Sequence, residues 1–322
     1  PTVESLSARV SGSEPGVQDD RAIAIRPSGS QPPLFLVHEG AGSIAYAQVL
    51  HPHIDAEIPV YALPAPSPSE PPLRTVEGMA ARLVRMIREV QPSGPYRVAG
   101  WSVGGVLAYE VAAQLIGQDE IVEFVGMLDS YHPVRAGAVP HDAAQEHALL
   151  LHVLRMAEAV EPNGRVDLDE AGVATGDVDL ETFVTRCREQ GLLPGHVTVE
   201  QARRMRDLLR DHQRALREYS PQPLPVAVHL FPAQQSADPE PSRGWRVTLP
   251  ATQLRVTPVP GTHLSMMRPP NTAALGEALS RALGEARKGQ APPSAGGSPV
   301  VTLQGGAALA GLLAEDRGAR EG

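Results

Sequence analysis

The sequence predicts an α/β fold, with a mostly parallel central sheet and helices on both of its faces. The first observation behind this prediction is that short apolar segments typical of strands alternate with amphipathic segments typical of helices. Such alternation indicates right-handed strand–helix–strand crossovers, and strands that are apolar throughout suit a sheet covered on both sides. The second observation is that residues 142–219 show helical periodicity alone, which predicts a helical insertion on the α/β scaffold.

The expected elements can be placed in chain order. Residues 75–92 contain the clearest helix, because the apolar side chains share one face, Thr75 is placed to cap the N-terminus and Pro92 lies beyond the end. The segment after Ser102 is apolar almost throughout and is predicted to be a second helix. Strands are predicted over residues 21–25, 33–38, 59–64, 96–100, 122–128, 225–233 and 253–260, with a terminal helix over residues 271–288.

Composition narrows the choice of partners and location. The formal net charge of −9 disfavours nucleic acid and anionic membranes, because both select positively charged surfaces. No segment approaches the roughly 18 apolar residues of a membrane span, and no charged-then-apolar leader opens the chain. Cys187 is the only cysteine, so an intrachain disulfide is excluded and a cytoplasmic location is favoured. Neither a metal site nor a directly bound cofactor is expected.

Three regions are expected along the chain. Residues 21–287 are predicted to form one domain, and the helical insertion covers about residues 135–220 of it. Residues 1–20 are predicted to begin with a short helix and to continue as a linker rich in Ser, Gly, Pro and Asp. Residues 288–322 are rich in Pro, Gly, Ala and Ser, which predicts a flexible tail or linker. The first residue is Pro and not Met, which indicates a piece of a longer protein.

The segment Gly100-Trp101-Ser102-Val103-Gly104 lies between a predicted strand and a predicted helix. In this context Gly-x-Ser-x-Gly is typical of a nucleophile elbow, a strained turn that lifts a serine hydroxyl out of the carboxyl edge of a sheet. The turn also places Ser102 at a helix N-terminus, where free N–H groups favour developing negative charge. The alternative is a glycine-rich turn whose serine has no chemical role, and the flanking strand and helix favour the nucleophile.

A serine nucleophile needs a general base, usually histidine, which is oriented by a carboxylate. In α/β-hydrolases these residues follow one another in the order Ser, acid, His. His263 is the best candidate for the base, because it follows the last predicted strand on a Gly-Thr turn. Of the other histidines, one ends an early strand before the elbow, His38, and three lie in helical segments and are predicted to be surface residues, His147, His152 and His212.

Two aspartates compete for the role of the acid. Asp129 ends an apolar strand, so that a strand end would present its side chain toward the elbow. Asp238 lies in a polar loop after the next strand, which is where many hydrolases of this fold keep their acid. Asp129 is favoured because a strand end is a more rigid support than a polar loop.

An acyl-transfer site also needs N–H donors for the oxyanion. The amide of Val103, directly after Ser102, is one expected donor. The second donor is expected from the glycine-rich turn after the strand at residues 33–38, and Gly40 is the predicted residue. An ordinary tight turn at Gly40 is the alternative.

With these residues in place, the chain resembles the thioesterase domain that ends non-ribosomal peptide synthetases and polyketide synthases. The resemblance covers about residues 23–287 and includes the helical insertion, which corresponds to the lid of that family. "GPYRVAGWSVGG" is similar to its elbow, "VGMLDS" to its acid strand and "GTHLSMM" to its histidine loop, which implies family roles for Ser102, Asp129 and His263. "PLFLVHEGAGS" is similar to its oxyanion loop but has Glu39 where the family usually has proline, which leaves the donor open between Gly40 and Ala41.

The resemblance implies an α/β-hydrolase fold and acyl transfer in two steps. Ser102 would take an acyl or peptidyl chain from a phosphopantetheine arm of an upstream carrier domain, and the lid would decide whether water or a group of the chain itself releases it. "PTVESLSARV" looks like the last helix of such a carrier domain, and "SPVVTLQGG" faintly resembles the first strand of another thioesterase. The alternatives are a free-standing serine esterase or proofreading thioesterase, and a catalytically silent α/β-hydrolase domain that only docks a partner.

Overall fold

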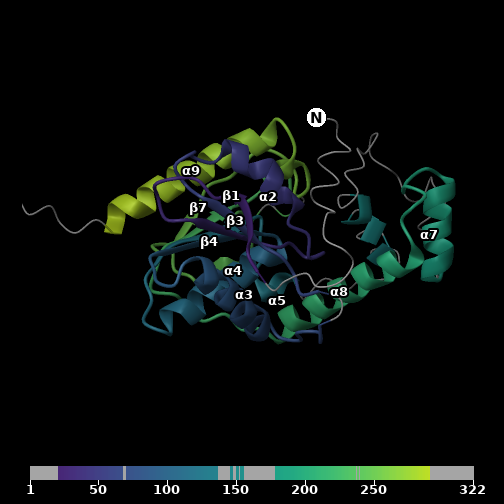
Figure 1. The fold of residues 1–322 in the computed structure, drawn as a ribbon, viewed down its shortest axis with the longest axis horizontal. Helices are drawn as coiled ribbons and strands as arrows, with labels where there is room; N and C mark the ends of the chain where they lie inside the picture. The colour runs from purple at the N-terminus through teal and green to yellow at the C-terminus, as the bar shows by residue number, and fades with distance from the viewer. Residues whose placement is uncertain are drawn as a thin grey trace, which may run out of the picture.

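A computed structural model describes residues 21–67, 70–136, 146–147, 150–151, 153–155, 178–236, 238 and 240–290 (Figure 1). Its described residues form a seven-stranded sheet in the order β1-β3-β2-β4-β5-β6-β7. Only β1 pairs antiparallel with its neighbour, and every other pairing in this sheet is parallel. The predicted α/β architecture with a mostly parallel sheet is therefore confirmed.

Each predicted strand has a counterpart in the sheet. Five of these strands are shorter than predicted, at the edges of the sheet and inside it, while β4 extends one residue further, to Trp101, and β5 has the predicted bounds. The strands are β1 (Ile23–Arg26), β2 (Leu34–Val37), β3 (Val60–Leu63), β4 (Tyr96–Trp101), β5 (Val122–Leu128), β6 (Val228–Phe231) and β7 (Leu254–Val256).

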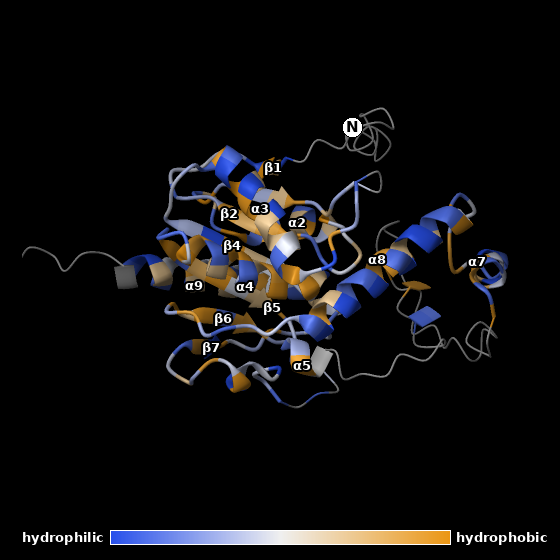
Figure 2. Ribbon diagram, turned by 90° about the horizontal axis from the view of Figure 1, so that it is seen from below, coloured by the Kyte–Doolittle hydropathy of each residue, from blue (hydrophilic) through white to orange (hydrophobic). Residues whose placement is uncertain are grey.

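Helices cover both faces of the sheet, and an apolar core lies between the sheet and the helices on each face (Figures 1 and 2). One core lies between the sheet and helices α3 and α4, and a second core lies between the sheet and helices α2 and α9. The helices are α2 (Ala45–Leu50), α3 (Val76–Val90), α4 (Val103–Ile116), α5 (Pro133–Ala136), α7 (Leu180–Glu189), α8 (Val199–Glu218) and α9 (Asn271–Gln290), with 3-10 turns η1 (His51–His53), η2 (Trp245–Val247) and η3 (Ser265–Met267).

Local signals explain where the helices begin. Thr75 caps α3 as predicted, because its Oγ1 accepts a hydrogen bond from the Gly78 amide at 3.1 Å. A capping box formed by Thr198 and Gln201 opens α8 in the same manner. The short helix α2 was not predicted, since six residues are too few to establish a helical period in the sequence.

The register of the central strands brings three strand ends to one edge of the sheet. Trp101 at the end of β4 pairs with Leu128 at the end of β5, and Leu128 pairs with Phe231 at the end of β6. Ser102 and Asp129 are the residues that directly follow two of these ends. Since ligands of open α/β sheets bind outside the carboxyl ends of the strands, this edge is the place to look for a site.

The insertion is helical in its described part. Helix α8 runs from the carboxyl edge of the sheet outward, and α7 lies at its far end, away from the sheet (Figures 1 and 2). A separate small apolar core, which includes Phe183 and Cys187, holds α7 against α8. Cys187 is fully buried in this core, and burial raises the pKa of its thiol to about 12. The short helix predicted at the start of residues 1–20 lies outside the described residues, as do residues 291–322 of the predicted tail, whereas residues 288–290 of that tail belong to α9.

None of the helices that the described residues form is both long and apolar enough to cross a bilayer. No group of three or more His, Cys, Asp or Glu side chains in this part of the chain is arranged to hold a metal ion.

Candidate active site

Ser102 occupies a strained turn between β4 and α4. Its backbone has φ 57° and ψ −123°, a conformation that a residue with a side chain adopts only under constraint from its surroundings. The Ser102 amide donates to the Leu128 carbonyl at 2.9 Å, which ties the turn to the neighbouring strand. A Cβ atom at Gly100 would collide with the Gly104 carbonyl, and one at Gly104 would collide with the His38 carbonyl. The glycines of the motif are therefore required by close backbone packing around the serine.

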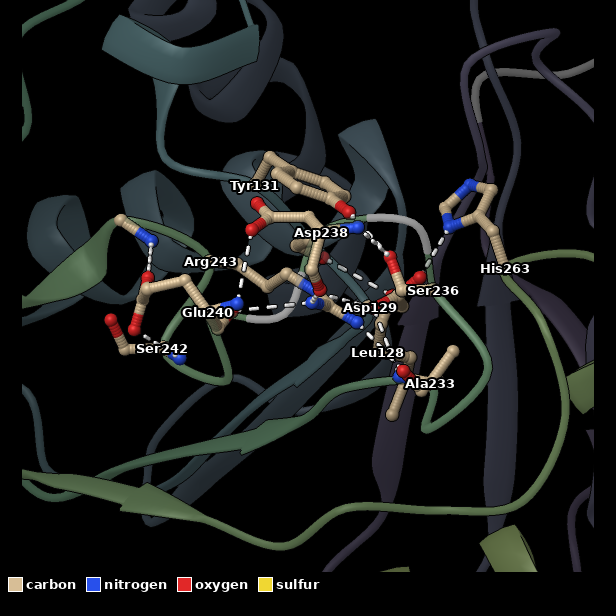
Figure 3. Close-up of polar contacts among 12 residues, drawn as sticks. Leu128, Asp129, Tyr131, Ala233, Ser236, Asp238, Glu240, Ser242, Arg243 and His263 are labelled. Carbon is tan, nitrogen blue, oxygen red and sulfur yellow. Dashed lines mark hydrogen bonds and ion pairs between the residues drawn. The ribbon is translucent and has the colours of Figure 1, made fainter.

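Asp129 and His263 are hydrogen-bonded at the same edge of the sheet (Figure 3). Asp129 directly follows β5, is completely buried and has φ 44°. Its Oδ2 accepts a hydrogen bond from His263 Nδ1 at 2.8 Å, and its Oδ1 accepts one from the Ala233 amide at 3.0 Å. A neutral His263 with its proton on Nδ1 has Nε2 free to accept a proton from another group.

The Asp129 carboxyl is ionised at neutral pH. Burial on its own raises the pKa of Asp129, but it is outweighed by the hydrogen bond and charge of His263 and by hydrogen bonds from Ala233 and Arg243. The pKa of Asp129 consequently lies below its ordinary value.

Trp101 connects the histidine to the serine turn. Its indole ring is 2% exposed and lies against the His263 ring, with centroids 5.3 Å apart and planes at 35°. Trp101 also precedes Ser102, and the strand register places it opposite Leu128, which precedes Asp129. The structure thus brings Ser102, Asp129 and His263 to one place, and the buried Trp101 packs between the histidine and the serine turn.

Asp238, the competing acid, has other partners. Its Oδ1 accepts a hydrogen bond from the Glu240 amide at 3.0 Å, and its main-chain carbonyl accepts one from Arg243 Nη1 at 2.8 Å (Figure 3). The Nδ1 atom of His263 bonds to Asp129 instead. Asp238 therefore stabilises its own loop, while Asp129 contacts the histidine.

The turn after β2 is organised by Glu39, the residue that departs from the family pattern. The two oxygens of its carboxylate accept the amides of Ala41, at 2.8 Å, and Ser43, at 3.1 Å. A Cβ atom at Gly40 would lie 3.3 Å from Val103 Cγ2, which places Gly40 beside the residue that follows Ser102. The Ala41 amide is engaged by Glu39, whereas the Gly40 and Val103 amides have no acceptor among the described residues.

Glu39 is a half-buried acid whose charge interacts with that of His263. Burial raises the pKa of Glu39 to about 7, although hydrogen bonds from the Ala41 and Ser43 amides and the charge of His263 work in the opposite direction. The carboxyl that holds this turn therefore titrates near neutral pH.

Two histidines were predicted wrongly as surface residues. His212 on α8 is 2% exposed and its Nδ1 donates to the Gly40 carbonyl at 2.7 Å, while His147 is 7% exposed and stacks on Phe183 at 4.3 Å. Both were misplaced because helical periodicity alone does not reveal which other element covers a polar position. His152 lies outside the described residues.

Arg243 is a residue of the site that the sequence analysis missed. It is 2% exposed and its Nε donates to Asp129 Oδ1 at 2.8 Å (Figure 3). It lies in the polar segment Ser242-Arg243-Gly244, a context typical of an exposed loop, so that no signal in the sequence indicates its burial.

Comparisons with known proteins agree with this arrangement. The family described as "Thioesterase domain" matches residues 32–283. The non-reducing polyketide synthase crz7 of Cladonia metacorallifera is 31% identical over 276 residues, which cover 81% of this chain and 12% of that protein. The dimodular nonribosomal peptide synthase of Bacillus subtilis (strain 168) is 37% identical over 155 residues, which cover 47% of this chain and 6% of that protein.

Solved structures show the same fold. A four-domain nonribosomal peptide synthetase, holo-AB3403 bound to AMP and glycine, matches with a TM-score of 0.73 at 24% identity, over 87% of this chain and 21% of that one. The NocB thioesterase domain in covalent complex with a fluorophosphonate nocardicin G analog matches with a TM-score of 0.61 at 24% identity, over 82% of this chain and all of that one.

The sheet order, the helices on both faces and the strained serine turn define a serine hydrolase of the α/β-hydrolase fold. Within that class, the chain belongs to the thioesterase domain family, whose match extends over most of its length. The chain spans only 12% of the polyketide synthase of Cladonia metacorallifera and 6% of the dimodular peptide synthase of Bacillus subtilis.

Proposed function

We propose that this thioesterase takes an acyl or peptidyl chain from the phosphopantetheine arm of an upstream carrier domain and releases it by hydrolysis or macrocyclisation. The similarity to multidomain polyketide and peptide synthases supports a carrier-bound substrate. The proposal includes a domain over residues 21–287, a lid at about residues 135–220 and a cytoplasmic location, which the single cysteine favours.

Ser102 is the proposed nucleophile. His263 Nε2 accepts the hydroxyl proton while Ser102 Oγ forms a bond to the thioester carbon, and the carbonyl π electrons move onto the oxygen. Asp129 holds the Nδ1–H tautomer of His263 and stabilises the imidazolium that forms. When the tetrahedral intermediate collapses, the carbon–sulfur bond breaks and the imidazolium protonates the departing thiolate of the phosphopantetheine arm.

The oxyanion is proposed to be bound by the amides of Gly40 and Val103. Both amides lack an acceptor among the described residues, and the two residues are neighbours across the site. Ala41 is the weaker candidate, because its amide already donates to Glu39. N–H groups that are fixed before the reaction stabilise the developing charge without any cost of reorganisation.

The acyl-enzyme is resolved by the reverse sequence of proton transfers. His263 accepts a proton from water, or from a hydroxyl or amine of the bound chain, as that group attacks the ester carbon. Ser102 then leaves with the proton that the imidazolium returns to it. Helix α8 extends from the carboxyl edge of the sheet, which supports the proposal that the insertion governs which nucleophile reaches the ester.

The observation that carries the proposal is the His263–Asp129 hydrogen bond beside the strained Ser102 turn in a chain of the thioesterase family. We expect the protein, mixed with a carrier domain that bears a peptidyl thioester, to gain the mass of the acyl group and then to release a free acid or a ring. The matched control is an oxoester of the same acyl group with a simple alcohol. Faster turnover of the oxoester than of the carrier thioester would favour a free-standing esterase, and no covalent adduct with either would favour a silent docking domain.

A further inference from the structure

The guanidinium of Arg243 makes four hydrogen bonds inside the protein. Its Nε donates to Asp129 Oδ1 at 2.8 Å and its Nη2 donates to the Ala233 carbonyl at 2.7 Å. Its Nη1 donates to the carbonyls of Asp238, at 2.8 Å, and Glu240, at 3.2 Å (Figure 3). A side chain bonded in four directions has one orientation, so Arg243 offers Asp129 a rigid, charged donor.

We propose that Arg243 is a positioning residue with two effects. It holds the Asp129 carboxylate in place, and its positive charge partly offsets the effect of the Asp129 negative charge on His263. The two carboxylate oxygens are divided between these functions: Oδ1 is held by Arg243 and the Ala233 amide, and Oδ2 accepts from His263 Nδ1. With Oδ1 held by two donors, the direction of Oδ2 is set. The proposal rests on the roles proposed above for Asp129 and His263, which the Asp129→Asn variant tests by itself.

The sign of the electrostatic effect follows from the charges around His263. Ionised Asp129 favours the protonated imidazole, Glu39 does so only above its raised pKa of about 7, and Arg243 is a cation that disfavours it. Removal of the cation therefore makes His263 easier to protonate, so that the free base is lost at a higher pH. The acidic limb of the pH profile of kcat/KM reports this loss.

We expect Arg243→Met to move that acidic limb upward by about one pH unit and to lower kcat roughly tenfold to hundredfold, because a neighbouring charge is removed and the carboxylate is no longer fixed. A small acyl thioester is a suitable substrate. Arg243→Lys is the matched control: it keeps the charge, so the limb should stay in place even if stability falls. The downfield proton resonance of the His263–Asp129 hydrogen bond should broaden in the Met variant and persist in the Lys variant.

A double variant separates positioning from general support of the fold. In the Asp129→Asn background, Arg243→Met should cause no further loss of kcat, because its effect passes through Asp129. Two results would show that Arg243 only supports its loop. One is an acidic limb of the kcat/KM profile that does not move in Arg243→Met, and the other is a loss of kcat on Arg243→Met that is as large in the Asp129→Asn background as in the wild type. If the Met variant does not fold, Arg243→Gln removes the same charge, retains polar donors and decides the question by the same pH profile.

A second observation links the insertion to the oxyanion turn. His212 of α8 donates from Nδ1 to the Gly40 carbonyl at 2.7 Å, and its ring stacks on His38 with centroids 5.6 Å apart. His38 Nδ1 donates in turn to the Glu39 carbonyl at 2.9 Å. Burial lowers the pKa of both histidines, to about 3 for His38, so both are neutral at pH 7. Since each Nδ1 faces a carbonyl, which can only accept, each must carry its proton there.

The geometry points to His212 as a positioning residue through which α8 holds the oxyanion turn. The Gly40 amide lies in the chain between the Glu39 carbonyl and the Gly40 carbonyl. His38 donates to the first of these carbonyls and His212 to the second, so both sides of the amide are fixed. Leu209 of α8 also lies against the turn, since a Cβ atom at Gly40 would lie 3.7 Å from its Cδ2. A displacement of α8 would release the turn. This inference rests on the proposed donor role of Gly40.

We expect His212→Leu to weaken binding of a trifluoromethyl ketone analogue of the acyl chain roughly tenfold to hundredfold, because its tetrahedral oxyanion needs an ordered hole. Binding of the matching amide, which forms no oxyanion, should change less than about twofold. His212→Asn is the matched rescue, because its amide nitrogen lies where Nδ1 lies in histidine. Equal weakening of both ligands, or equal loss in the Asn and Leu variants, would overturn the inference. If the Leu variant does not fold, His212→Gln replaces it, since its amide reaches the Nε2 position.

Discussion

Ser102→Ala is expected to lower kcat by about 10⁵- to 10⁶-fold, because it removes the atom that carries the acyl chain between the two half-reactions. The fold should persist. The Ser102 hydroxyl has no hydrogen-bond partner among the described residues, so its loss leaves no buried polar group unsatisfied. Alanine retains the Cβ atom, so the strain of the turn at φ 57° is unchanged, and the free energy of unfolding should shift by less than about 1 kcal/mol.

Intact-mass spectrometry and thermal unfolding test this expectation together. The wild-type protein should gain the mass of the acyl group from a thioester or of the phosphonyl group from a fluorophosphonate, and Ser102→Ala should gain neither. Ser102→Cys is the matched control, because a thiolate beside histidine remains nucleophilic and should still form the acyl adduct. A covalent adduct on the alanine variant would assign the nucleophile to another residue.

The serine turn could be predicted because its determinants are local in sequence. Strand, turn and helix follow one another within residues 96–116, and the glycines that the turn requires are part of the same short motif. The parallel sheet was predictable for a related reason, since alternating strands and helices restrict the possible connections to a few. The antiparallel pairing of β1 and the short helix α2 carry no comparable signal.

The surroundings of the site could not be predicted because they depend on contacts between distant parts of the chain. Arg243 meets Asp129 across 114 residues and His212 meets Gly40 across 172. A lone arginine in a Ser-Arg-Gly loop and a lone histidine in a polar helix are most often exposed, and only the folded chain shows which polar groups they satisfy. His263 lies 134 residues from Asp129, and it was predictable only because the order of Ser, acid and His is shared by hydrolases of this fold.

The Glu39 turn shows how a departure from a family pattern can be interpreted once its contacts are known. Glutamate at this position accepts the Ala41 and Ser43 amides, so the turn is closed by a side chain where the family usually has proline. This bonding pattern distinguishes Gly40 from Ala41 as the candidate donor, a choice that the sequence left open. Burial also raises the pKa of Glu39 to about 7, so the charge of this turn changes near neutral pH.

The last expectation separates the two acids. Asp129→Asn should lower kcat by roughly 10³- to 10⁴-fold, about 4–5.5 kcal/mol of transition-state stabilisation, because the amide no longer stabilises the His263 imidazolium or holds its reactive tautomer. Asp238→Asn should lower kcat by less than about tenfold, because an Asn Oδ1 can still accept the Glu240 amide in the same place. The two variants make the same chemical change, so the difference between them isolates the contact with His263.

Stability must be measured beside kcat, because Asp129→Asn also removes the partner of the buried Arg243 cation, a change that typically costs about 3–5 kcal/mol. Kinetics are therefore compared well below the unfolding temperature, with the folded fraction determined by circular dichroism. The pH dependence supplies an internal check. The lowered pKa of Asp129 contributes stability that is present above the unfolded-state pKa and is lost as the pH falls through the folded-state pKa, and this loss should be absent from the Asn variant. A larger kcat loss in Asp238→Asn than in Asp129→Asn would assign the acid to Asp238, and the hydrogen bond between Asp129 and His263 would then have only a structural role.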